Sequence, residues 1–348
     1  MIMIINNKKF NILFFFLSCF WLTACSPEKN QLHQHQLFVF GTLVDISVWH
    51  DDANQVTMAI SEISDTFNQM HTQWHAWKPG RLQQINQQLQ QGKTVNLTTE
   101  ESHFIAQTID YSLASNHLFN PTIGKIISLW GFHTDEYPIL TPPPDSTEIQ
   151  ALIDSGLNVN VLQLENQQFS STNPNVWLDF GGIAKGYAID QAIKILQKHH
   201  VNSGIVNAGG DLRSLGAKGN KPWRIAIQSP TDWSTLADFT VMDNEAVFTS
   251  GNYQRFKQFD GKRYAHIIDP NTGMPVDYIV SATVITDQGI KADAAATALV
   301  VAGKDWYQTA AAMGIDQALV INERHQCFTT KLMLRRLENL SISCDVID

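Results

Sequence analysis

The sequence has few cysteines and lacks several patterns that mark common ligand sites. Four cysteines occur in 348 residues, with no Cys-x-x-Cys pair and no Cys/His cluster at zinc spacing, so a structural zinc site of that type is excluded. No Gly-x-Gly-x-x-Gly segment occurs, which leaves a Rossmann dinucleotide site without support. There is no internal repeat, and the net charge of −9 argues against a nucleic-acid surface.

One apolar run stands near the N-terminus, and no second run is long enough to cross a bilayer. Lys8 and Lys9 precede the apolar residues 10–22, and the run ends in Leu22-Thr23-Ala24-Cys25. This is typical of a lipoprotein signal peptide over residues 1–24, with cleavage before Cys25 and lipid on its sulfur. The alternative is an ordinary secretory signal with a chance cysteine.

The remaining chain predicts a short tether followed by one large domain. Residues 25–36, with the polar stretch 31–36, are interpreted as the tether, and residues 37–348 as the domain. The proline-rich segment 138–144 is a candidate sub-boundary, near 138–146. Cys327 and Cys344 are the cysteines left after the signal and the lipid site, and they could form a disulfide in an oxidising periplasm. Sequence leaves open whether their Cα atoms approach closely enough.

The central stretch of the chain predicts a strand, a glycine turn and a helix. Residues 176–180 are apolar apart from Asp179, Gly181-Gly182 breaks the run, and small or apolar residues then recur every four positions from Ala184. Such a turn can direct backbone N–H groups at an anion. Lys185 adds a cation at the helix start, where the helix dipole disfavours it, so a phosphate nearby is indicated. The alternative is an ordinary turn with a surface lysine.

Other elements follow from periodicity and turn residues. A strand is expected over 37–49, interrupted at Gly41-Thr42 by a bulge or a close backbone approach. Asp260-Gly261 is the strongest hairpin signal. Asp145 and Glu148 resemble a capping box. Helices are expected over 58–70, from 104 to 113, from 145 to 153 and over 292–302, with further strands over 159–164, 223–228, 239–242, 246–249 and 280–286.

A carboxylate and a hydroxyl share one face of the last of these helices. Asp293 and Thr297 are four residues apart among alanines, which leaves room for a ligand. Hard oxygen donors of this kind suit Mg²⁺. The alternative is an Asp cap with the Thr hydroxyl bonded to a backbone carbonyl.

Three further segments offer polar groups. His266 follows the Asp260-Gly261 hairpin and could serve as a general base because its intrinsic pKa lies near neutrality, although a structural histidine is the commoner case. Ser250-Gly251 and the turn 207–211 could present N–H and hydroxyl groups to phosphate.

Together these segments resemble, in order and spacing, the ApbE family of FAD:protein FMN transferases. The matching segments are 178–190, 207–211, 250–251, 266–275 and 292–303, with Phe40-Gly41-Thr42, Trp77-Lys78-Pro79 and Leu118-Phe119-Asn120-Pro121 before them. The resemblance covers about Val39 to Val320. It implies an α+β fold related to the T-fold, with strands and helices around an FAD cleft.

The resemblance also implies an activity and a set of roles. FAD is split at its pyrophosphate, FMN passes to a Thr or Ser hydroxyl of a partner protein, AMP leaves, and Mg²⁺ is required. By position, Asp293, Thr297 and the carbonyl of Gly182 would hold Mg²⁺, and His266 would activate the acceptor hydroxyl. The expected FAD-binding residues are Phe40, Trp77, Leu118, Phe119, Asn120, Asp179, Lys185, Asn207, Asp211, Ser250 and Val276.

The chain departs from the family pattern at three of these positions. Phe40 replaces a usual Met, Trp77 a frequent Tyr, and Asn120 a frequent Asp, whose lost charge puts that FAD contact in question.

Two rival functions use the same residues: hydrolysis of FAD to FMN and AMP, and non-catalytic flavin binding. The acceptor pattern Asp-x-x-Ser/Thr-Gly-Ala-Thr/Ser is absent here, so the acceptor is expected to be another protein, such as a membrane redox-pump subunit.

The resemblance implies a lipid anchor in the inner membrane, facing the periplasm, whereas Ser26 is not typical of an inner-membrane retention signal and leaves the outer membrane open.

Overall fold

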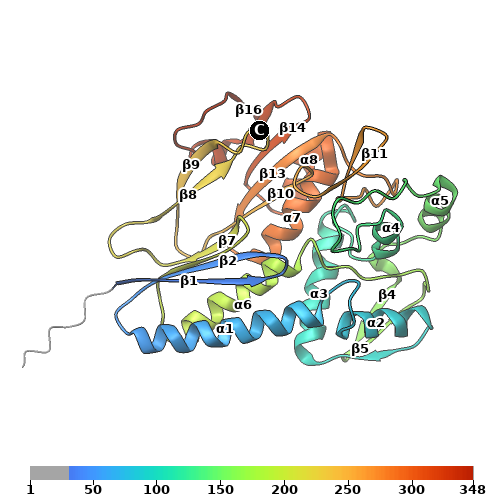
Figure 1. Cartoon of the computed structure of the whole chain (residues 1–348), viewed down its shortest axis with the longest axis horizontal. Coiled ribbons are helices and arrows are strands. Elements are labelled where there is room, and N and C mark those ends of the chain that lie inside the picture. Colours follow the sequence, from blue (N-terminus) through green and yellow to red (C-terminus); the bar gives the residue numbers. More distant parts are fainter. Residues whose placement is uncertain (1–30, 348) are drawn as a thin grey trace, which may run out of the picture.

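A mixed sheet of nine strands forms the centre of the molecule, in the order β1-β2-β6-β7-β10-β13-β14-β15-β16 (Figure 1). The structure is a computed structural model and describes residues 31–347. Neighbouring strands are antiparallel except for β15 and β16, which are parallel. The strands are β1 Gln31–Val39, β2 Thr42–His50, β6 Gly204–Ala208, β7 Asp211–Leu215, β10 Ala246–Gly251, β13 Ile279–Thr286, β14 Gln317–Asn322, β15 Cys327–Thr330 and β16 Cys344–Ile347.

Helices and three small sheets surround this sheet. The helices are α1 Ala53–Gln73, α2 Arg81–Gln90, α3 Thr99–Ala114, α4 Gly124–Leu129, α5 Ser146–Asp154, α6 Ala184–Lys198, α7 Gly289–Ala302, α8 Trp306–Ala312 and α9 Lys331–Leu334, with 3₁₀ turns η1 Val159–Val161 and η2 Gly303–Asp305. The small sheets pair β3 Val95–Asn96 and β4 Leu162–Glu165 with β5 Gln168–Ser171, β8 Trp223–Gln228 with β9 Thr235–Val241, and β11 Phe256–Phe259 with β12 Lys262–Ala265. Within residues 31–347, no helix is both long and apolar enough to span a bilayer.

In the middle of the sheet both faces are buried, as β14 illustrates. Ala318 and Val320 join the large hydrophobic core on the side of α1, α6 and α7, whereas Leu319 and Ile321 join a smaller core under β8 and β9. Alternate residues of a strand point to opposite faces, so a strand covered on both sides is apolar throughout. The large core places α6 and α7 side by side against the central strands (Figure 1).

The predicted tether over residues 31–36 is wrong, because these residues belong to β1. Strand β1 pairs with β2 along its whole length, from Gln31 opposite His50 to Val39 opposite Thr42. Backbone pairing does not need apolar side chains, and the polar residues of this edge strand remain largely accessible.

The single strand expected over 37–49 is therefore a hairpin. Phe40 and Gly41 form its two-residue turn with φ of 57° and 73°, so Gly41 provides neither a bulge nor a close approach.

The strand predicted over residues 176–180 is also wrong. Only Trp177 makes an isolated bridge, to Ile123, and the stretch is otherwise extended without a ladder. The amide of Asn86 bonds to both the N–H and the C=O of Leu178 at 2.7 and 3.0 Å, and the N–H groups of Trp177 and Asp179 donate to main-chain carbonyls of the loop 121–122. Pairing with a side chain and a loop cannot be recognised from apolar periodicity. The helix after the glycines is confirmed as α6.

Most of the remaining elements are confirmed, with shifted ends. Asp260 and Gly261 form the turn between β11 and β12, and α7 ends at Gly303 as predicted. The strand expected over 159–164 begins as η1 and becomes β4. Asp145 caps α5 through the N–H of Thr147. Buried side chains on both sides of residues 138–146 belong to the same core, and the domain division stays a prediction.

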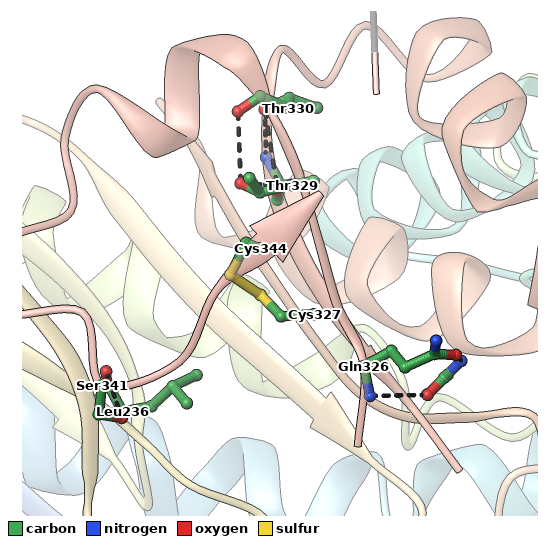
Figure 2. Close-up of a disulfide and its surroundings, with 9 residues drawn as sticks. Leu236, Gln326, Cys327, Thr329, Thr330, Ser341 and Cys344 are labelled. Carbon is green, nitrogen blue, oxygen red and sulfur yellow. Dashed lines mark hydrogen bonds between the residues drawn. A yellow bond between two sulfur atoms is a disulfide. The ribbon is translucent and has the colours of Figure 1, made fainter. Parts of the chain in front are cut away.

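The pair left open by the sequence forms a disulfide, shown in Figure 2. Cys327 and Cys344 lie opposite each other on the parallel strands β15 and β16, with their Cα atoms 4.5 Å apart. This bond fastens the last strand to the edge of the sheet. Residues 1–24 and Cys25 lie outside the described part of the chain.

Candidate functional site

The site is built where the N-terminus of α6 meets α7. The N–H of Gly186 donates to Asp293 Oδ2 at 2.9 Å, which joins the first turn of α6 to the middle of α7. A Cβ on Gly186 would lie 2.2 Å from the carbonyl oxygen of Gly289, so only glycine permits this approach. The predicted turn and the predicted Asp293/Thr297 face are therefore neighbours in space.

Gly182 and Thr297 are in direct proximity. A Cβ built on Gly182 would lie 3.0 Å from Thr297 Oγ1 and 3.5 Å from the ring of Phe119. Thr297 Oγ1 lies 3.2 Å from Ser250 Oγ at the end of β10. Three segments that are far apart in the sequence, the Gly182 turn, the end of β10 and α7, thus meet around the Thr297 hydroxyl.

Asp293 is buried, with 4% of the residue exposed. Burial raises the pKa of its carboxyl to about 7, against the opposing effect of the Lys185 ammonium. Among the described residues, Oδ2 has a hydrogen-bond donor in Gly186 and Oδ1 has none. A desolvated carboxylate oxygen next to a hydroxyl suits a hard cation, because the cation would compensate the buried charge. Within residues 31–347, no three His, Cys, Asp or Glu side chains gather as a metal cluster, so a cation here would need the hydroxyl and carbonyl oxygens.

Lys185 forms an ion pair with Asp211 at the start of β7. Asp211 Oδ1 also accepts the N–H of Thr249 at 2.9 Å. Burial alone would lower the pKa of Lys185, but the Asp211 and Asp293 carboxylates outweigh it and raise that pKa above its ordinary value. The ammonium is therefore charged at neutral pH, held beside Asp293 and available to a phosphate.

Asp179 is bound by a histidine that the sequence analysis did not identify. His133 Nε2 lies 2.9 Å from Asp179 Oδ2, and the N–H of Gly181 donates to Oδ1 at 2.8 Å. Burial would raise the pKa of Asp179, but the hydrogen bond and charge of His133, the Gly181 N–H and the Arg255 charge together outweigh it, so the pKa is lowered and Asp179 is a carboxylate. No spacing signal connects His133 with Asp179, because the two meet only through tertiary folding.

Trp77 covers the same histidine. The two rings stack at 5.1 Å with an interplanar angle of 17°. The guanidinium of Arg255 lies 5.5 Å from the centre of the Trp77 ring. His133 Nδ1 and Arg255 Nε are buried without a hydrogen-bond partner in the described part of the chain. Trp74, the other tryptophan of residues 71–80, packs in the core against Phe104 and Phe180.

His266 follows β12 directly and is held by the main chain. Its Nδ1 lies 2.9 Å from the carbonyl oxygen of Arg255, so Nδ1 carries the hydrogen and Nε2 is the basic nitrogen. Burial, followed by the Arg255 charge, lowers its pKa from 6.5 to about 4. The expectation that His266 titrates near its intrinsic pKa is thus wrong, because desolvation disfavours the imidazolium. Lys185 and Asp179 also influence this pKa, as expected of charges in the same site.

Several predicted FAD contacts have other partners in the protein. Asn120 accepts the N–H and hydroxyl of Thr122 and donates to the carbonyl of Leu157 at 2.8 Å, which uses both ends of its amide. Asn207 Oδ1 closes the β6–β7 turn through the N–H of Gly210 at 2.8 Å. These side chains shape loops, and their contacts with FAD stay predictions.

The apolar predicted contacts Phe40, Leu118 and Val276 lie in three different surroundings. Phe40, in the β1–β2 turn, packs against Phe67 with ring centres 5.4 Å apart. Leu118 lines a cavity of about 590 Å³ that also includes Asp269 and Asp305. Val276 is half-buried against the core, and its N–H donates to the carbonyl of Ile267 at 3.0 Å.

Comparison with known proteins identifies the family. The sequence model of the ApbE family matches residues 40–319. The chain is 36% identical over 321 residues to the FAD:protein FMN transferase of Rhodobacter capsulatus, covering 91% of this chain and 60% of the relative. It is 32% identical over 188 residues to the enzyme of that name from Escherichia coli strain K12, covering 53% of this chain and 54% of the relative. The matches thus span between half and two thirds of the length of these relatives.

The fold agrees with this result. The crystal structure of the ApbE protein from Thermotoga maritima superposes with a TM-score of 0.82 at 29% identity, covering 89% of this chain and all of that one. The predicted α+β class is confirmed by this likeness. With its glycine turn, its paired helices and its match over residues 40–319, the chain belongs to the ApbE family.

Proposed function

We propose that this protein transfers FMN from FAD to a Thr or Ser hydroxyl of a partner protein, with Mg²⁺ bound and AMP released. The observation that carries the proposal is the meeting of Gly182, Asp293 and Thr297 beside the Lys185 ammonium. Oxygen donors next to a half-buried ammonium suit a pyrophosphate and its metal. The names of the relatives from Rhodobacter capsulatus and Escherichia coli support the same activity.

The residues have distinct tasks in this reaction. Asp293, Thr297 and the Gly182 carbonyl would hold Mg²⁺, which when bound offsets the charge of the pyrophosphate. Lys185 would bind a phosphate oxygen. The acceptor hydroxyl oxygen attacks the FMN phosphorus, the bond from that phosphorus to the bridging oxygen of AMP breaks, and the hydroxyl proton passes to His266 Nε2. A neutral imidazole is needed for this step, and the lowered pKa of His266 keeps it neutral at physiological pH.

Hydrolysis of FAD to FMN and AMP is the second candidate, because water could replace the acceptor hydroxyl in the same site. The distinguishing experiment incubates the protein with FAD, Mg²⁺ and an acceptor protein bearing an Asp-x-x-Thr-Gly-Ala-Thr segment. Transfer leaves a fluorescent acceptor band on a denaturing gel and releases AMP, whereas hydrolysis releases FMN and AMP without labelling. Intact FAD after incubation would instead support a flavin-binding protein without catalysis. An acceptor with the flavinylated threonine changed to valine is the matched control.

We also propose a lipid anchor at Cys25 and a periplasmic location at the inner membrane, where a membrane redox-pump subunit could serve as acceptor. The support is the sequence of the N-terminal segment, with Lys8, Lys9 and Leu22-Thr23-Ala24-Cys25. Cys25→Ser should release the protein into the soluble periplasmic fraction or leave the precursor uncleaved. Normal processing with unchanged membrane fractionation would contradict the anchor, and density fractionation of the wild type distinguishes the two membranes.

A further inference from the structure

The two helices that form the site each lack a cap of their own. Neither the N-cap residue of α6, Ile183, nor that of α7, Gln288, makes a side-chain capping hydrogen bond. The first N–H groups of a helix need acceptors, and a buried helix end without them is costly. Both ends here are buried in the contact between the helices, where Gly186 touches Gly289.

Each helix receives its missing acceptor from the other. Asp190 on α6 accepts the N–H of Gly289 through Oδ1 at 2.7 Å and the N–H of Ile290 through Oδ2 at 3.0 Å. In return, Asp293 on α7 accepts the N–H of Gly186 at 2.9 Å. Two aspartates thus cap each other's helices, and one of them is the carboxylate of the proposed metal site.

Strand β7 forms two ion pairs with α6, and it supplies the acid in one pair and the base in the other. Asp211 binds Lys185 of α6, and Arg213, two residues along the same strand, donates from Nη1 to Asp190 Oδ1 at 2.5 Å. Residues i and i+2 of a strand point to the same face, so both side chains reach α6. A slide of α6 along β7 would bring like charges together. Arg213 is itself held by Asn244, whose Oδ1 accepts from Nη2 at 2.8 Å.

We propose that Asp190, held by Arg213, is the positioning residue of the metal site. Asp190 fixes the position of α7 relative to α6. It thereby fixes the distance of the α7 ligands Asp293 and Thr297 from the glycine turn and Lys185. The inference rests on the proposed function, because it takes these oxygens as the metal ligands. Asp190 is not among the proposed ligands of FAD or the metal, and its effect is transmitted through the hydrogen bonds at Gly289, Ile290 and Gly186.

The test measures Mn²⁺ binding directly, without turnover. Mn²⁺ alone is titrated into the full-length protein, and free Mn²⁺ is followed by electron paramagnetic resonance. Asp190→Asn should weaken binding by about 10–100-fold, the range usual for residues that orient metal ligands. Arg213→Gln, which leaves both caps in place, should weaken binding in the same direction, and Arg213→Lys should restore part of it.

A matched control separates positioning from general stability. Glu101 is also a buried carboxylate paired with an arginine, Arg81, and it completes the capping box of α3. Glu101→Gln should lower the melting temperature as Asp190→Asn does and leave the Mn²⁺ dissociation constant unchanged. Wild-type Mn²⁺ affinity in folded Asp190→Asn and Arg213→Gln would overturn the inference. If Asp293→Asn also binds Mn²⁺ as the wild type does, the metal assignment of the proposed function fails instead.

Discussion

The main chains of Gly186 and Gly289 are in contact where α6 crosses α7. A Cβ on Gly186 would lie 2.2 Å from the Gly289 oxygen, and one on Gly289 would lie 2.7 Å from the Gly186 oxygen. Because both atoms approached are backbone atoms, no side-chain rotation can relieve either clash. The glycine turn before α6 can therefore lie close to the Asp293 face of α7 only because residues 186 and 289 have no side chains.

Gly186→Ala should accordingly destabilise the protein and reduce its activity together. Alanine is the better helix former, but the two helices must move apart, and overpacking of this kind costs about 1–3 kcal/mol or more. Thermal unfolding and FMN transfer should both report the change. Lys194→Ala is the control, since residue 194 is exposed on the same helix and its substitution should leave both measurements unchanged.

The sequence predicts those parts of the site that depend on residues close together in the chain, and it does not predict contacts between residues far apart in the chain. The helix after Gly182 and the shared face of Asp293 and Thr297 follow from local spacing, and both are present. The bond from Asn86 to Leu178, and that from His133 to Asp179, join residues far apart in the sequence. Neither leaves a periodic signal, so the extended stretch 176–180 resembles a strand, and His133 is not recognised as part of the site.

Asp293→Asn should abolish Mg²⁺-dependent transfer with little loss of stability. We choose Asn over Ala because Asp293 is buried and caps α6. An amide oxygen can still accept the Gly186 N–H, whereas Ala would lose a cap worth about 0.5–2 kcal/mol. Activity across a Mg²⁺ titration, with the melting temperature beside it, provides the measurement. Asp65→Asn, at an exposed position in α1, should behave as the wild type, and full activity of Asp293→Asn would remove the metal role.

His133→Gln should weaken FAD binding if Asp179 contacts FAD. Without the Nε2 hydrogen bond and the His133 charge, the pKa of Asp179 should rise, so that a larger fraction of its carboxyl is protonated and loses an acceptor oxygen. A loss of about tenfold in affinity corresponds to about 1.4 kcal/mol, close to the lower end of the contribution of one hydrogen bond to a charged group, about 1.5–3 kcal/mol. Quenching of FAD fluorescence gives the affinity. His103→Gln, exposed on α3, is the control, and unchanged FAD affinity in His133→Gln would exclude this role for the histidine.

Loss of the disulfide should lower stability and spare catalysis. Cys327 and Cys344 are separated by 17 positions, and closing a loop of that size contributes about 3 kcal/mol in the chain-entropy account. Cys344→Ser should reduce the free energy of unfolding by about this amount in urea. Reductant should do the same to the wild type and nothing further to the variant. The FMN transfer rate of folded protein should not change, because β15 and β16 lie at the sheet edge beyond β13 and β14. A rate that falls with the disulfide would connect this edge to the site.

The last prediction concerns His266, whose titration should appear in the stability of the protein. Its pKa is about 4 in the folded chain and near 6.5 when unfolded, so the unfolded state binds more protons between these values. The free energy of unfolding should therefore decrease as pH falls from 6.5 toward 4, and the neutral imidazole contributes its full stability only above 6.5. His266→Gln removes this group, and the difference in unfolding free energy between wild type and variant should shrink over that interval. His325→Gln, at an exposed position in the β14–β15 turn, should keep the wild-type pH dependence.

The same variant separates chemistry from binding. If His266 accepts the hydroxyl proton, His266→Gln should slow FMN transfer by roughly 10²–10⁴-fold at neutral pH, the usual contribution of a general base. FAD affinity should hardly change, because the proposed ligands of the pyrophosphate are Lys185 and the metal site. A purely structural histidine gives another pattern, since loss of its bond to the Arg255 carbonyl would disturb the segment that also holds Trp77. FAD affinity and transfer would then decline in proportion. Transfer measured at saturating FAD decides between the two, and a near-normal rate there would exclude His266 as the base.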